Sequence, residues 1–194
     1  MPHKNLGLSA DEGFFFGHGR KDMPIYAFDG KKPVVGDGTW VAPSAYIIGN
    51  VTIGSRCWIG PGAVIRGDFG AIVIGDDTAV EDGVVIHTPA LVTIGKAVTI
   101  GHSALIHGRS VGDYAVVGMH STLGDNSVVG SWSIVAEHSL VKKNQVVPDS
   151  KLYAGVPAVE KGDISQQHRD IMLLGKQMYT ELAARYLSSL ERLD

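Results

Sequence analysis

An aliphatic residue recurs at every sixth position over long stretches between Ile47 and Val147, and this spacing constrains the fold more than any other feature of the chain. An amphipathic helix requires apolar residues at spacings of three and four, and a half-buried strand requires short alternation. A β-solenoid explains a period of six, because each unit forms one short strand and a corner, with the aliphatic side chain pointing inward. The longest run in phase is Val111, Val117, Leu123, Val129, Val135, Val141 and Val147.

Three such units make one triangular coil, so the period predicts an all-β solenoid, a parallel β-helix of hexapeptide repeats. Many of the aliphatic residues precede a glycine, as in Ile53-Gly54, and we expect these glycines at corners because they reach conformations that a side chain forbids. Three breaks in phase predict two corner insertions and a one-residue deletion. They are the steps from Ile65 to Ile74, from Ile86 to Ile94 and from Ile106 to Val111.

The two ends of the chain lack the period of six. We expect an N-terminal extension at 1–23, a β-helix domain at 24–160 and a C-terminal helix at 161–194. Asp163 and Gln166 have the spacing of a capping box at the start of this helix. Its apolar stripe predicts packing along one flat face of the solenoid or against another subunit. The stripe consists of Ile171, Leu174, Met178, Leu182, Tyr186 and Leu190.

Charge and cysteine content limit the partners of the chain. The net charge is −3 and lysine and arginine do not cluster, which argues against nucleic acid and anionic membranes as partners. The single cysteine, Cys57, excludes an intramolecular disulfide, and we expect it to be a packed structural thiol in a reducing cytoplasm. No long apolar run lies near the start, so we expect neither a secretory signal nor a membrane span.

Two histidines occupy the same position of the repeat. His87 and His107 each follow an inward aliphatic residue, and their separation of 20 equals one coil plus the insertion of two residues between them. Arg66 precedes His87 by 21, which is one coil plus an insertion of three. We therefore expect Arg66, His87 and His107 to form a column on successive coils.

His102 lies almost one repeat before His107, so we expect it on the neighbouring face, pointing away from the column. A second subunit could bring its own His102 to His87 and His107. Three neutral imidazoles with an open fourth position are the ligand set of a catalytic zinc site. Closed cyclic symmetry then favours a homotrimer with a metal site at each interface, holding Zn²⁺, with Fe²⁺ or Co²⁺ as alternatives.

A second pair of histidines provides a comparison. His120 and His138 are 18 apart, and each lies three positions after an inward aliphatic residue, so they should also stack. No third partner can be identified for them. We expect surface residues here, with adventitious metal binding as the alternative.

The chain contains the motifs Arg66-Gly67-Asp68, Glu81-Asp82, His87, Gly101-His102-Ser103-Ala104-Leu105-Ile106-His107-Gly108, Gly118-Met119 and Ala154-Gly155-Val156-Pro157-Ala158. With these motifs the region from Val64 to Met119 resembles the γ-class carbonic anhydrase family, and the resemblance extends over residues from about 24 to 160. It implies a left-handed β-helix and a homotrimer, with zinc held by two histidines of one chain and His102 of the next. It also implies an ion pair between Arg66 and Asp68 across the subunit interface, and a role for Asp82 in lining or orienting the site.

Two departures from the family pattern concern the chemistry. Many relatives carry Asn-x-Gln-Asp where this chain has Ala79-Val80-Glu81-Asp82, so Glu81 replaces the glutamine that hydrogen-bonds the metal-bound hydroxide. The short connection 68–72 has no room for the acidic loop that shuttles protons in the archetypal enzyme. The chain therefore resembles the short-loop branch, which includes carnitine-operon and phenylacetate-pathway proteins, and the latter resemble thioesterases.

Our first hypothesis is a zinc lyase that hydrates carbon dioxide to bicarbonate. Zinc would lower the pKa of water from about 15.7 towards 7, and Glu81 and Asp82 would position the hydroxide. The alternatives are hydrolysis of an acyl-CoA thioester at the same zinc, CoA-dependent acyl transfer with histidine as general base, and a non-enzymatic trimeric scaffold.

Overall fold

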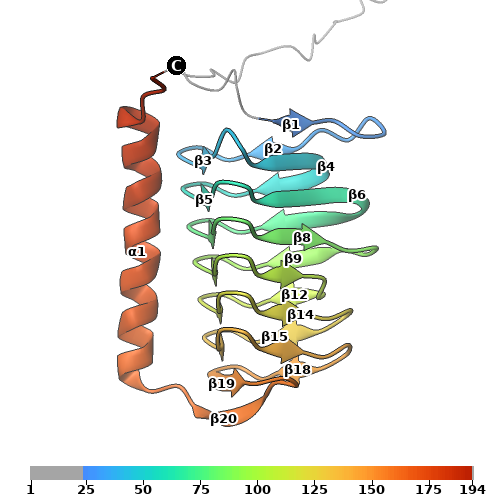
Figure 1. Ribbon diagram of the computed structural model, residues 1–194, viewed down its shortest axis with the longest axis vertical. Coiled ribbons are helices and arrows are strands. Elements are labelled where there is room, and N and C mark those ends of the chain that lie inside the picture. The colour runs from blue at the N-terminus through green and yellow to red at the C-terminus, as the bar shows by residue number, and fades with distance from the viewer. Residues whose placement is uncertain (1–23, 194) are drawn as a thin grey trace, which may run out of the picture.

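The computed structural model describes residues 24–193, which form a parallel β-helix with one long helix along its side (Figure 1). Most coils contribute three short strands, and the strands of successive coils pair in parallel. The solenoid predicted from the period of six is therefore confirmed. Residues 1–23, including Phe14-Phe15-Phe16, lie outside the described part of the chain.

The three faces of the solenoid are named here by what lies on them. The helix face is an eight-stranded sheet of β3 (Trp40–Val41), β5 (Trp58–Ile59), β7 (Ala79–Val80), β10 (Thr99–Ile100), β13 (Val116–Val117), β16 (Ile134–Val135), β19 (Lys151–Ala154) and β20 (Val159–Asp163). The histidine face contains β1 (Ile25–Tyr26), β8 (Val85–His87), β11 (Leu105–Ile106), β14 (Thr122–Leu123) and β17 (Leu140–Val141). The third face contains β2 (Val34–Val35), β9 (Val92–Ile94), β12 (Ser110–Val111), β15 (Val128–Val129) and β18 (Val146–Val147).

Two long strands join the histidine face to the third face. β4 (Tyr46–Ile53) and β6 (Val64–Ile74) continue around the corner between these faces, so that both faces belong to one twelve-stranded sheet. The chain passes from the helix face to the histidine face and then to the third face. We call the corner between the first two the His102 corner, and the corner between the last two the His107 corner.

The inward aliphatic residues stack in register along the solenoid axis. On the histidine face Ile65 pairs with Ile86 and Ile86 pairs with Ile106. All three side chains are fully buried, and most of the equivalent residues of the other faces are also buried. Each one removes apolar surface from water at about 25 cal/mol per Å², which makes this column the main source of stability.

The breaks in phase fall at corners, as predicted. Gly49 pairs with Gly67 and Val51 pairs with Ile72, so β6 holds its three extra residues opposite Asn50 without leaving the sheet. The second insertion forms the turn 88–91 between β8 and β9, and the deletion shortens the coil in which Ile94 pairs with Val111.

The glycines that follow the inward residues serve a different purpose from the one predicted. Their φ angles are not positive, whereas non-glycine residues such as Asn126, with φ 55°, occupy the left-handed region at the corners. A Cβ on Gly75 would lie 2.7 Å from the carbonyl carbon of Gly95 in the next coil. These glycines are required because backbones of successive coils approach closely, and the expectation based on unusual φ values was wrong.

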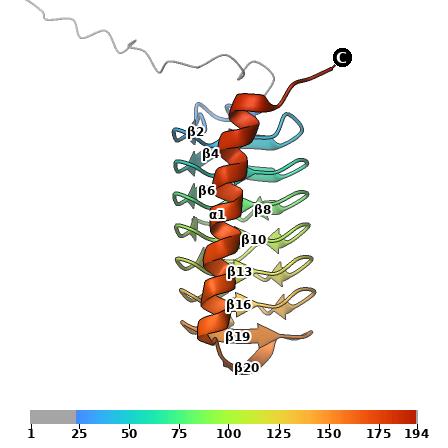
Figure 2. The same cartoon turned by 90° about the vertical axis from the view of Figure 1, so that its left-hand side faces the viewer.

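Helix α1 (Gln166–Ser189) runs along the helix face, with Figure 2 showing it in front of the strands. It packs against β3, β5 and β7, where Tyr186 lies edge-on to Trp40 and Trp58 with ring centroids 4.8 Å apart. The predicted capping box was placed wrongly: Ser165 caps the helix and His168 is its partner, since both reciprocal contacts involve these two residues.

The predicted apolar stripe of α1 only partly faces the solenoid. Leu182 and Tyr186 pack against the core, but Ile171, Leu174 and Met178 are exposed. The buried residues of α1 are instead Met172 and Ala183. The side of the helix that packs on the solenoid is therefore rotated away from the predicted stripe.

Cys57 is a buried free thiol, as expected. Burial raises its pKa to about 11, so it is protonated at neutral pH and is a poor nucleophile. Within 24–193 there is no helix with the length and hydropathy needed to cross a membrane.

Candidate metal centre

His87 and His107 lie beside each other at the His107 corner. His87 ends β8 and His107 follows β11, and the parallel register of these strands places the two rings with centroids 6.1 Å apart and planes at 61°. Arg66 pairs with His87 on the preceding coil. The predicted column of Arg66, His87 and His107 is confirmed.

Asp68 holds His87 from the preceding coil. Its Oδ1 lies 2.9 Å from Nε2 of His87, and its Oδ2 forms an ion pair with Nη1 of Arg66. Partial desolvation by itself raises the pKa of the Asp68 carboxyl, but hydrogen bonds from Arg66 and His87 outweigh it and lower that pKa, so Asp68 is ionised at neutral pH. The ion pair between Arg66 and Asp68 was expected across a subunit interface, but it forms within one chain because both side chains extend from β6.

Asp125 orients His107. Its Oδ1 is 2.5 Å from Nδ1 of His107, which leaves Nε2 of this ring available. The hydrogen bond from His107 lowers the pKa of the Asp125 carboxyl, and Lys143 lies 3.7 Å from its other oxygen. Our sequence analysis did not identify Asp125. The signal was present, because Asp125 follows His107 by 18 positions, which is one coil.

His102 follows β10 and lies at the His102 corner, away from the other two histidines as predicted. Glu81 accepts a hydrogen bond of 3.0 Å from the backbone N–H of His102, and the same carboxylate oxygen is 3.2 Å from Nε2 of the ring. Asp82 is more distant, at 4.0 Å from Nδ1. Helix α1 adds a third contact, because the side chain of Tyr179 lies beside the Glu81 carboxylate.

Burial raises the pKa of Tyr179 well above its ordinary value, and the neighbouring Glu81 carboxylate raises it further. Tyr179 is therefore a neutral donor at all ordinary pH values. Glu81 is almost fully buried, and its contacts fix it beside His102 of its own chain.

The donor set at the His107 corner fits zinc in its chemistry. Two imidazoles lie edge-on to each other there, and a carboxylate orients one of them through one ring nitrogen, as is usual for histidine ligands of zinc. In the described residues of a single chain, no three histidine, cysteine or carboxylate side chains gather as a metal site would require. A metal site with three protein ligands at this corner would therefore need a ligand from outside the described residues of one chain.

His120 and His138 stack as predicted, with ring centroids 4.9 Å apart and planes at 10°. They lie at the His102 corner on the coils that follow His102, since His120 donates its backbone N–H to the carbonyl of His102.

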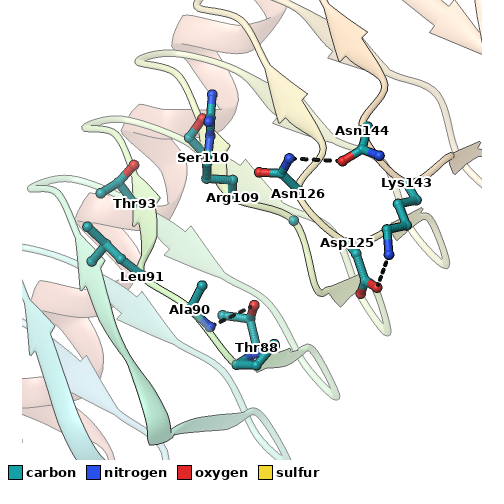
Figure 3. A pocket seen from close by; sticks show the side chains of 12 residues that line it. Thr88, Ala90, Leu91, Thr93, Arg109, Ser110, Asp125, Asn126, Lys143 and Asn144 are labelled. Carbon is teal, nitrogen blue, oxygen red and sulfur yellow. Dashed lines mark hydrogen bonds and ion pairs between the residues drawn. The ribbon is translucent and has the colours of Figure 1, made fainter.

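A groove of about 700 Å³ opens next to His107. Figure 3 shows the turn 88–91 on one side of it and the corner residues Asp125, Asn126, Lys143 and Asn144 on the other. Arg109 lies between the two sides, so the lining carries two cationic side chains and one carboxylate. The groove is within the size range of sites for drug-sized ligands.

Two family models and one relative show the family to which the chain belongs. The model described as "Bacterial transferase hexapeptide (six repeats)" matches residues 32–67, and "Hexapeptide repeat of succinyl-transferase" matches 50–87 and 91–119. The carnitine operon protein CaiE of Citrobacter koseri is 38% identical over 172 residues, which cover 87% of this chain and 86% of the relative. The chain belongs to the CaiE family of hexapeptide-repeat proteins.

Solved structures agree with membership of the CaiE family. The hexapeptide transferase family protein of Anaplasma phagocytophilum is 33% identical, with a TM-score of 0.82 over 86% of this chain and 99% of that protein. The product of the BC4754 gene of Bacillus cereus is 28% identical, with a TM-score of 0.84 over 87% and 99% of the two chains. The resemblance to the carnitine-operon branch, found from the motifs alone, is therefore confirmed.

Proposed function

We propose that this protein is a zinc-dependent enzyme of the γ-carbonic anhydrase type that hydrates carbon dioxide at sites shared between subunits. The observation that carries the proposal is the pair of neighbouring imidazoles, His87 and His107, with Asp125 orienting one of them. Zinc held by these residues and by His102 of a neighbouring copy would supply a nucleophile at neutral pH by lowering the pKa of water to about 7.

A further observation supports a neighbouring copy. On the histidine face, outward side chains in register form a mostly apolar row, and Tyr46 and Leu105 are exposed in the single chain. This row lies between the two corners that carry the histidines, so a copy that covers it also brings one His102 corner towards one His107 corner. Closed symmetry makes three such contacts in a homotrimer. The row consists of Tyr46, Val64, Val85, Leu105, Thr122 and Leu140.

The residues of this chain would have different roles at such a site. Asp125 and Asp68 hold the rings of His107 and His87, and Glu81 presents His102 from the opposite corner. Arg66 keeps the Asp68 carboxylate ionised and in place. Because Glu81 accepts a hydrogen bond from His102 and lies beside Tyr179, we assign it to positioning. Asp82 is exposed, and we assign it the role of the carboxylate that faces the substrate.

Zinc content and carbon dioxide hydration test the proposal together. We expect about one zinc per chain in protein purified without chelators, and hydration in stopped flow that is abolished in His107→Ala. Asp125→Asn should bind zinc about ten to one hundred times more weakly, because the ring of His107 loses its orienting acceptor.

Asp163→Asn is the matched control, since it removes the same charge from a carboxylate that pairs with Lys151 far from the site. It should leave zinc affinity unchanged. Less than about half a zinc per chain, or hydration no faster than in His107→Ala, would contradict the proposal.

The groove favours a second candidate, hydrolysis of an acyl-CoA thioester at the same zinc. A space of about 700 Å³ exceeds the needs of carbon dioxide, and Arg109 and Lys143 match the phosphates of a CoA carrier in charge. Water would add to the thioester carbonyl, and the C–S bond would break to give a carboxylate and free CoA thiol.

A single variant separates the two candidates. Arg109→Ala should raise the KM for acyl-CoA about tenfold, because a charge-assisted contact is lost, and should leave carbon dioxide hydration unchanged. Thiol release on several acyl-CoAs measures the first rate and stopped flow the second. Lys142→Ala, at an exposed position outside this groove, is the control. Absence of thiol release in the unaltered protein rules out the thioesterase.

A further inference from the structure

Five large apolar side chains of α1 are exposed in the single chain, and three of them lie in one stripe. Ile171, Leu174 and Met178 are 60%, 58% and 60% exposed, and their spacing of three and four places them in one stripe along the helix. Leu182, which is half-buried, continues the stripe towards the packed side of the helix. We call these three exposed residues the α1 stripe.

Contacts on the two flanks of α1 show which way the stripe faces. Lys176 lies 4.0 Å from Asp77, at the corner between the third face and the helix face. Tyr179 contacts Glu81, at the opposite corner, which carries His102. Each residue turns the helix by about 100°, and Ala183 lies at the centre of the packed side. The α1 stripe therefore lies next to Tyr179 on the helix surface, on the flank that is near the His102 corner.

The His107 corner has its own exposed apolar residues. Phe69 is 76% exposed and its ring centroid lies 5.7 Å from that of His87, while Leu91 in the turn 88–91 is 52% exposed. Neither is covered within the described residues of one chain. Exposed apolar groups of this size at two separate corners are typical of a surface that another molecule covers.

We propose that the α1 stripe docks on the His107 corner of a second copy of this chain, against its Phe69 and Leu91, and forms one wall of the shared site. This inference rests on the proposed function, in which the His102 corner of one copy meets the His107 corner of the next. The stripe lies on the flank of α1 that faces that contact. Continuity with the contact and the apolar character of both surfaces identify the second copy as the occupant.

The positions of the α1 stripe and of the His107 corner along the solenoid axis agree with this docking. His102 and His107 belong to the same coil, so copies that share a metal between them stand side by side without an axial offset. Met178 adjoins Tyr179, which contacts Glu81 in the coil directly before that of His102. The turn that carries Leu91 follows β8 in that same coil, so Met178 and the Leu91 of the neighbouring copy lie at matching heights.

Leu174→Glu/Met178→Glu tests the docking, because it places two charges in the proposed contact. We expect the unaltered protein to sediment as a trimer and the variant as a monomer, with zinc binding weakened about tenfold or more by loss of the neighbouring His102. The matched control is Leu173→Glu/Gln177→Glu, which shifts the two charges by one residue to exposed positions off the stripe. This control should remain trimeric with unaltered zinc affinity.

A trimeric Leu174→Glu/Met178→Glu variant with unaltered zinc affinity overturns the docking and leaves the shared zinc site standing. An unaltered protein that is monomeric, or whose zinc affinity does not depend on His102, overturns the proposed function and the docking with it. Should the glutamates prevent folding, as judged by circular dichroism, Leu91→Cys/Met178→Cys decides. A flexible bismaleimide should then join its chains into covalent trimers, and monomers alone overturn the proposal.

Discussion

Mixed trimers of His102→Ala and His107→Ala chains are expected to bind zinc, although each variant alone is expected to lose it. In the proposed site the ligands come from two chains, so a chain without His107 still presents an intact His102 to its neighbour. A chain without His102 still offers an intact His87 and His107. All three ligands are present at an interface where the His107→Ala chain provides His102 and the His102→Ala chain provides His87 and His107.

The expected recovery follows from the symmetry. In any cyclic trimer that contains both kinds of chain, one of the three interfaces joins a donor with intact His102 to a receiver with intact His107. About a third of the sites should therefore be restored, in both zinc content and carbon dioxide hydration. The two variants are co-expressed with different tags and purified through both, so that only mixed assemblies are measured.

A second mixture provides the control. His87→Ala with His107→Ala damages the same corner in both chains, so no arrangement of these subunits restores a site. Equal recovery in this mixture, or none in the first, would show that the site is not shared as proposed. Retention of zinc by His102→Ala alone would exclude His102 as a ligand.

The register of the site could be predicted from sequence because parallel coils convert chain separation into position. Once the insertions are subtracted, Arg66, His87 and His107 must fall on successive coils, and the observed pairing agrees. The same rule also gives the position of Asp125, which lies one coil beyond His107. It was overlooked because an aspartate at a corner has no distinguishing chemistry until the ring that it holds is recognised.

Other parts of the site depend on contacts that no repeat specifies. Tyr179 reaches Glu81 only because of how α1 is rotated on the helix face, and that rotation is set by the packing of Trp40, Trp58 and Tyr186. The apolar stripe of the sequence suggested a different rotation. The helix instead buries its small and aromatic residues, which leaves part of the stripe for another surface.

Gly70→Ala is expected to disrupt the coil that supports His87. A Cβ at this position would lie 2.0 Å from the carbonyl oxygen of Ala90 and 2.3 Å from its carbonyl carbon. Both are backbone atoms in the turn 88–91, so no side-chain rotation can relieve the overlap. The two insertions at the His107 corner, one in β6 and one after β8, must then move apart.

The cost of this separation should be large for a single methyl group. Overpacking usually costs about 1–3 kcal/mol, and rigid backbone on both sides places Gly70→Ala near or above the upper limit. The displacement should also weaken zinc binding, because Asp68 and Phe69 precede Gly70 and both contact His87. The denaturation midpoint in urea and a zinc titration measure the two effects.

Gly175→Ala is the control for this substitution. Gly175 lies in α1 with no atom within 4 Å of an added Cβ, so alanine there should raise the free energy of unfolding by up to about 1 kcal/mol through helix propensity. An unchanged midpoint and zinc affinity in Gly70→Ala would mean that the two corner insertions are not rigidly coupled. In that case the orientation of His87 must depend on Asp68 and Arg66 alone, and Arg66→Ala should then weaken zinc binding more than Gly70→Ala does.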